Sequence, residues 1–146
     1  MREFIPFAID EEIAEIGRAL VDRTLPKARW THGAHFAATL WLLESRGLDD
    51  VARELPGLIR AYNEATGVRN NEAGGYHETI TQASLRAAAW FRAARPGMPL
   101  FAVCNALMET PLGGSDWILD YWSHERLFSV EARSVWVEPD LRRLPF

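Results

Sequence analysis

Apolar residues recur every three or four positions along most of the chain, which is the spacing that places them on one face of a helix. The first such face comprises Ile9, Ile13, Ile16 and Leu20. Asp10 is predicted to cap this helix at its start and Pro26 to end it. No segment shows the strict alternation of apolar and polar residues that is typical of a strand, so the pattern predicts an all-α protein.

Four further long helices are predicted from the same spacing and from capping residues. They cover residues 31–46 with Thr31 as N-cap, a segment from Asp49 or Asp50 through Tyr62, residues 76–95 and residues 99–109. Because Pro56-Gly57 lies inside the third helix, we expect a kink or a break into two short helices there. Residues 67–75 and 110–114 are predicted to be loops.

The last third of the chain is predicted to contain two shorter helices. Ser115 is expected to cap one of about two turns, and Ser129 to cap the other. Residues 135–146 are predicted to form an irregular tail that packs against the rest, since the tail is rich in apolar side chains. We therefore expect residues 1–146 to form one domain, a bundle of about five to seven helices with an irregular C-terminal tail.

Composition excludes several classes of function. Charged residues make up 25% of the chain and hydrophobic residues 48%, which is typical of a globular protein. The net charge of −4 argues against a nucleic-acid partner, and no apolar run approaches the roughly 20 residues that span a bilayer. Residues 1–6 do not resemble a signal peptide, and the single Cys104 suits a reducing compartment, so a cytoplasmic location is expected.

Histidines supply the strongest candidate chemistry. His32 and His35 are three positions apart in the predicted second helix and therefore share a face. His77 falls in the first turn of the predicted fourth helix, again on the side expected to face the core. The three imidazoles meet if these two helix starts lie at the same end of the bundle. His124, in contrast, is expected near a helix end and facing solvent.

Three imidazoles around an open position are typical of catalytic zinc, and with a carboxylate they also suit iron or manganese. The metal hypothesis makes His32, His35 and His77 the ligands of a divalent Zn, Fe or Mn ion. Glu78 is then the candidate general base or fourth ligand, and Glu109 is a further candidate.

An anion is the alternative occupant of the same place. The N-terminal ends of helices favour negative over positive charge. Neutral histidines together with Thr31, Thr79 and Thr81 are therefore expected to suit a carboxylate or phosphate without any metal.

Three blocks of sequence together resemble a family of small bacterial helical proteins to which no function is assigned. The blocks are W-T-H-x-x-H at 30–35, G-Y-H-E-T-I-T at 75–81 and L-F-S-x-E-A-R-x-x-W-V-E-P-D at 127–140. The resemblance implies no substrate, cofactor or catalytic residue.

Two functions of different classes therefore stay open. The first is a helical protein with a histidine-lined pocket for a small molecule, acting as a metal-dependent enzyme of hydrolytic or oxygen chemistry. The second is a non-catalytic interaction or ligand-binding module, whose aromatic-rich C-terminal third forms a homodimer or partner surface. Neither a nucleic acid nor a membrane is an expected partner.

Overall fold

The computed structural model describes residues 4–146, which form seven α-helices and three short 3-10 helices. The long helices are α1 (Asp10–Asp22), α2 (His32–Arg46), α3 (Leu48–Ala65), α4 (Glu78–Ala93) and α5 (Leu100–Met108). The short ones are η1 (Lys27–Arg29), η2 (Pro111–Gly113), η3 (Trp117–Asp120), α6 (His124–Leu127) and α7 (Val130–Ser134). Within the described range there is no strand, so the all-α prediction is confirmed. None of these helices combines the length and the apolar character that crossing a bilayer requires.

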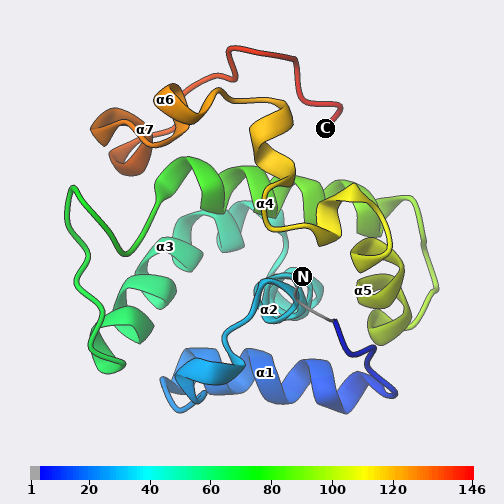
Figure 1. The fold of residues 1–146 in the computed structure, drawn as a ribbon. Coiled ribbons are helices and arrows are strands. Elements are labelled where there is room, and N and C mark those ends of the chain that lie inside the picture. Colours follow the sequence, from blue (N-terminus) through cyan, green and yellow to red (C-terminus); the bar gives the residue numbers. More distant parts are fainter. Residues whose placement is uncertain (1–3) are drawn as a thin grey trace.

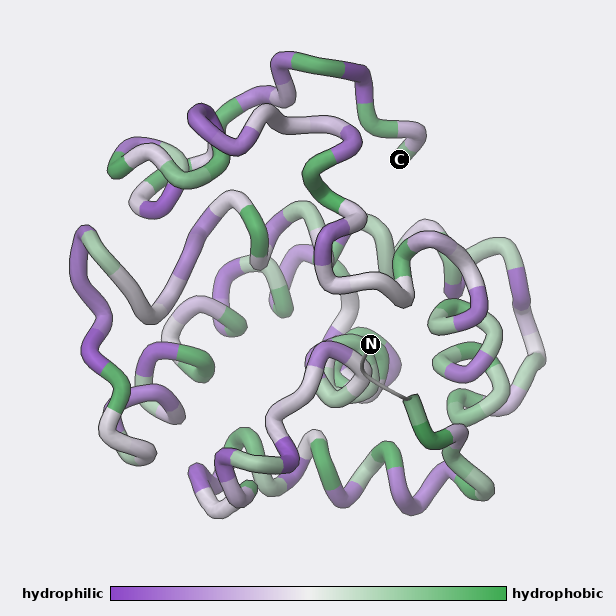
Figure 2. Tube along the Cα trace, viewed as in Figure 1, coloured by the Kyte–Doolittle hydropathy of each residue, from purple (hydrophilic) through white to green (hydrophobic). Residues whose placement is uncertain are grey.

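Helix α2 is the centre of the fold. Figure 1 shows it end-on, with α1, α3, α4 and α5 around it, and it contacts all four. Its buried residues point in every direction rather than to one side, and they are Gly33, Ala34, Phe36, Ala37, Ala38, Thr39, Leu40 and Leu42. A helix surrounded on all sides has to be apolar all round, and Figure 2 shows the matching hydropathy of α2.

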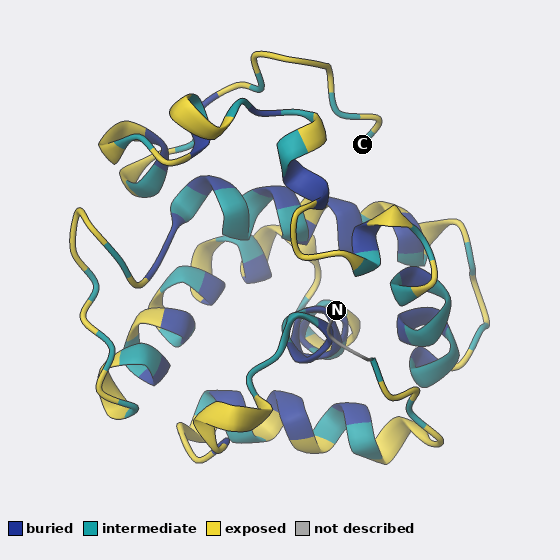
Figure 3. Cartoon of the chain, in the orientation of Figure 1, coloured by how far each residue is buried: buried dark blue, intermediate teal, exposed yellow. Residues whose placement is uncertain are grey.

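Helix α1 lies close to α2 because Gly17 has no side chain. A Cβ atom at Gly17 would overlap the indole ring of Trp41, which α2 contributes. The buried residues of α1 all lie on the side toward α2, as Figure 3 shows, and they include Ile13, Ile16 and Leu20 of the predicted apolar face. The predicted inward face of the first helix is thus confirmed.

Helix α3 continues through Pro56, so the expected break into two short helices is wrong. A proline has no N–H to donate to the carbonyl four residues earlier, which here is that of Ala52. Gln82 of α4 donates its Nε2–H to this carbonyl at 3.2 Å. A neighbouring helix therefore supplies the hydrogen bond that the proline removes.

The helix starts agree with the predictions only in part. Thr31 caps α2 by accepting a hydrogen bond from the Ala34 N–H, and Ser129 caps α7 in the same way. Asp10 is not a cap but the first residue of α1. Its carboxylate instead accepts from the N–H of Phe101 at 2.9 Å, which serves the start of α5. The Asp10 carboxylate therefore gives a hydrogen-bond partner to a main-chain N–H at the start of α5, far later in the sequence.

The C-terminal third differs from the predicted two-turn helix after Ser115. The chain forms η3 and then α6, which Ser123 caps. Beyond α7 the tail returns across α4, as Figure 1 shows. The hydroxyl of Thr79 in α4 donates to the carbonyl of Val135 at 2.9 Å and accepts from the N–H of Val137 at 3.2 Å. The tail is thus tied to the bundle, as its apolar composition predicted.

Candidate functional site

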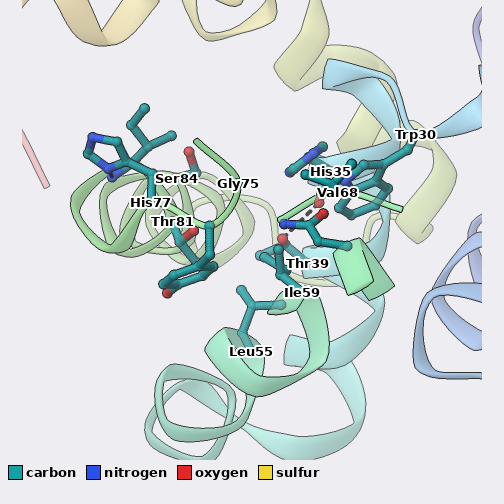
Figure 4. Close-up of a pocket in the computed structure, with 13 residues that line it drawn as sticks. Trp30, His35, Thr39, Leu55, Ile59, Val68, Gly75, His77, Thr81 and Ser84 are labelled. Carbon is teal, nitrogen blue, oxygen red and sulfur yellow. Dashed lines mark hydrogen bonds between the residues drawn. The ribbon is translucent and has the colours of Figure 1, made fainter. Parts of the chain in front are cut away.

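A cavity of about 390 Å³ lies between the start of α2, one side of α3, and the segment that leads into α4. We call it the His35 pocket. Its lining comprises Trp30, His35, Thr39, Leu55, Ile59, Asn63, Val68, Gly75, Tyr76, His77, Ile80, Thr81 and Ser84, most of which Figure 4 labels. Cavities of this size are common among sites for small molecules.

His35 contributes an imidazole ring to the lining of this pocket. Its imidazole stacks on the indole of Trp30, with ring centroids 3.7 Å apart. Within residues 4–146 neither ring nitrogen is hydrogen-bonded, and no side-chain nitrogen in this range is both fully buried and unpaired. Burial, and to a smaller extent the neighbouring His32, lower the pKa of His35 to about 3. The ring is therefore neutral at pH 7 and offers the cavity one N–H donor and one acceptor nitrogen.

His77 is the N-cap of α4 rather than a residue of its first turn, which corrects the sequence expectation. Its Nδ1 accepts from the Ile80 N–H at 3.1 Å, and its Nε2–H donates to the carbonyl of Leu127 at 2.7 Å. Figure 4 shows the imidazole turned away from His35. Both nitrogens are engaged with the main chain, and burial lowers the pKa of this ring as well. His77 therefore holds α6 against α4.

His32 is not part of the lining of the His35 pocket. Its Nε2 hydrogen-bonds the carbonyl of Leu112 at 2.7 Å. It lines a different cavity of about 790 Å³, which residues 4–7 and 113–116 help to enclose. The structure thus brings His35 and His77 to one pocket and leaves His32 at another.

The three-histidine metal centre is not assembled in this arrangement. No group of three or more His, Cys, Asp or Glu side chains within residues 4–146 is placed to hold a metal ion. Binding of zinc, iron or manganese by His32, His35 and His77 stays a prediction, and it has no preformed centre in the described part of the chain.

The carboxylates proposed to accompany the histidines lie outside the lining of the His35 pocket. Glu78 accepts a hydrogen bond from the hydroxyl of Tyr76, with 2.6 Å between the oxygens. Burial, with this hydrogen bond second, raises the pKa of Tyr76. Glu109 is exposed at the end of α5. Glu78 therefore fixes the Tyr76 ring and does not face the ligand space.

The three threonines predicted to help bind an anion do not lie together at one site. The hydroxyl of Thr31 caps α2, and that of Thr79 binds the tail. Only Thr81 lines the His35 pocket. His124, as predicted, is exposed, although it begins α6 instead of ending a helix.

Asn70 holds two lining residues of the His35 pocket, Asn63 and Tyr76, in place, and its role was not predicted from the sequence. Its Oδ1 accepts from the Asn63 side chain at 3.0 Å and from the Tyr76 N–H at 2.9 Å, while its Nδ2–H donates to the Arg60 carbonyl. Gly75 has φ of +81°, and a Cβ there would overlap the main-chain oxygen of Arg69. The available signal was the Asn-Asn and Gly-Gly pairs of residues 67–75, since these residue types favour tight turns.

Searches of protein-family models, of curated proteins and of solved structures found no match. Function therefore has to be inferred from the residues themselves.

Proposed function

We propose that the protein binds a small, uncharged, partly apolar molecule in the His35 pocket, with the His35 imidazole as its hydrogen-bonding partner. One observation carries the proposal. The imidazole lines a cavity of about 390 Å³ and has no partner for its nitrogens within residues 4–146. A ligand that hydrogen-bonds to these nitrogens gains that bond without breaking a hydrogen bond within the described part of the protein.

The lining supports an uncharged ligand. It contains no Asp, Glu, Lys or Arg side chain, and the low pKa of His35 keeps that ring neutral. An ion placed in such surroundings would lose its hydration without gaining a counter-charge. The proposed ligand is therefore neutral at pH 7.

The remaining lining residues indicate the functional groups of the ligand. Leu55, Ile59 and Val68 give the cavity an apolar side. The hydroxyl of Ser84 is a second polar group in the lining. A molecule with an apolar body and an alcohol, amide or heteroaromatic nitrogen matches both the apolar side and these two polar groups.

The low pKa of His35 favours a role in ligand binding over a role in acid–base catalysis. An effective general base has a pKa near the working pH, whereas the pKa of His35 is about 3. Glu78, the other candidate base, is directed to Tyr76. These two observations support a binding module and count against a histidine- or glutamate-based enzyme.

Ligand-observed NMR with a library of uncharged and charged fragments tests the proposal. We expect uncharged heteroaromatic amides and alcohols to bind wild-type protein and charged analogues of the same size not to bind. Because a neutral hydrogen bond contributes about 1 kcal/mol, His35→Phe and Ser84→Ala should each weaken these fragments by roughly fivefold.

His124→Phe is the matched control, since it makes the same chemical change at an exposed position. It should leave the affinity of every fragment unchanged. Equal binding by wild type and His35→Phe, a preference for charged fragments, or no binding from the whole library would each contradict the proposal.

A further inference from the structure

A third cavity, of about 260 Å³, shares Tyr76 with the His35 pocket and is lined by residues of α3, α7 and the segment before α4. We call it the Arg60 pocket. Its lining comprises Arg60, Asn70, Asn71, Glu72, Tyr76, Arg133 and Ser134. In contrast to the His35 pocket, it contains two guanidinium groups and one carboxylate, so its lining carries a net positive charge.

Both arginines are held in place by Tyr76 and its neighbour. The Arg60 guanidinium carbon lies 4.4 Å from the centre of the Tyr76 ring. One nitrogen of Arg133, Nη1, donates to the main-chain carbonyls of Gly75 and Tyr76 at 3.2 and 3.3 Å. The two guanidinium groups therefore converge on a single residue of the loop that precedes α4.

Neither arginine forms an ion pair within the described residues. The ion pairs found within residues 4–146 involve Arg18, Arg29, Arg46, Arg53 and Arg92. Arg60 and Arg133 are in none of them, although Glu72 lines the same cavity. The Nη2 and Nε donors of Arg133 also lack a partner in this part of the chain.

We propose that the Arg60 pocket binds an oxyanion, the phosphate or carboxylate group of a small molecule, between Arg60 and Arg133. Guanidinium groups present several N–H donors in a planar fork that matches two oxygens of such an anion. Arg133 is partly buried and pre-oriented by the main chain, so little side-chain freedom is lost when the anion binds. This proposal does not rest on the one made for the His35 pocket.

Backbone chemical-shift perturbation during titration with inorganic phosphate, and separately with acetate, tests this site and distinguishes the two anions. Chloride at the same ionic strength is the reference. We expect one or both oxyanions to shift residues around Tyr76 and Arg133 in wild-type protein. Because a hydrogen bond to a charged group contributes about 1.5–3 kcal/mol, Arg60→Gln and Arg133→Gln should each raise the dissociation constant about tenfold or more.

Arg143→Gln is the matched control, because Arg143 is exposed and lines none of the cavities described above. It removes the same charge and should change the affinity by less than about twofold, as screened surface charge does. If Arg133→Gln fails to fold, the dissociation constant of the oxyanion for Arg60→Gln alone tests the proposal. The proposal is overturned if neither oxyanion binds, or if all three variants bind as wild type does. Uncharged fragments in the His35 pocket give an independent result, so either proposal can fail without the other.

Discussion

At the scale of single residues, His35 links the pocket to folding stability. In the native protein its pKa is about 3, whereas its ordinary value is 6.5. Between these values the unfolded chain binds a proton at this ring and the native protein does not. The contribution of His35 to the free energy of unfolding should therefore be fully present above about pH 6.5. It should fall as the pH decreases toward 3, by up to about 1.4 kcal/mol for each pH unit.

Urea denaturation at about pH 7 and about pH 5 measures this contribution. His35→Phe keeps an aromatic ring against Trp30 and removes the titrating group, so its free energy of unfolding should depend less steeply on pH. His77 has its pKa lowered too, and its contribution stays in both proteins. The same pH slope in wild type and His35→Phe would refute the assignment, and His124→Phe should match wild type.

Sequence reasoning identified His35 as inward-facing but did not foresee its isolation from other polar groups. Spacing along a helix shows which residues share a face, and it was correct that this face is directed to the interior. The stacking on Trp30 is a contact between residues close in sequence. The burial that lowers the pKa of His35, in contrast, depends on how segments far apart in sequence pack together. No local pattern encodes that packing.

At the scale of secondary-structure elements, α3 and α4 are linked by a hydrogen bond that depends on Pro56. Gln82→Ala should leave the carbonyl of Ala52 without a partner and lower the free energy of unfolding by about 1–3 kcal/mol. In a Pro56→Ala background the new N–H can serve this carbonyl within the helix. The cost of Gln82→Ala should then be clearly smaller, which a double-mutant cycle in urea measures.

Equal costs of Gln82→Ala in the two backgrounds would contradict this account of α3. The starts of α2 and α7 show what local sequence rules capture. Thr31 and Ser129 were predicted as caps because their hydroxyls bond main-chain N–H groups two or three residues later. Pro56 was predicted to kink the helix or divide it in two because its missing hydrogen bond is local, while the Gln82 amide that replaces this bond comes from another helix.

At the scale of the whole molecule, Thr79 connects the bundle to the C-terminal tail. Thr79→Val keeps the shape of the side chain but leaves the Val135 carbonyl and the Val137 N–H without their partner. We expect a loss of about 1–3 kcal/mol in the free energy of unfolding and faster proteolysis within residues 135–146. Thr66→Val is the control, because its hydroxyl bonds only carbonyls of its own helix. A stable tail in Thr79→Val would show that the apolar contacts alone hold it.

The three-dimensional relation of the histidines was the part that sequence could not supply. Placing His32 and His35 on one helix was straightforward, but relating either to His77 required the relative position of α2 and α4. The structure shows that the start of α4 presents His77 to α6. The predicted homodimer stays a prediction, and the exposed apolar residues of the C-terminal third that it would cover are Phe128, Val130, Val135 and Leu141.

Tyr76 lines both the His35 pocket and the Arg60 pocket. Its hydroxyl is held by Glu78, its N–H by Asn70 and its ring by Arg60, so it has little freedom to adjust to one cavity alone. If a molecule in one cavity displaces this ring, the free energy of that displacement is shared with the other cavity. Thermodynamic linkage then requires the effect to be reciprocal: each occupant changes the affinity of the other by the same factor.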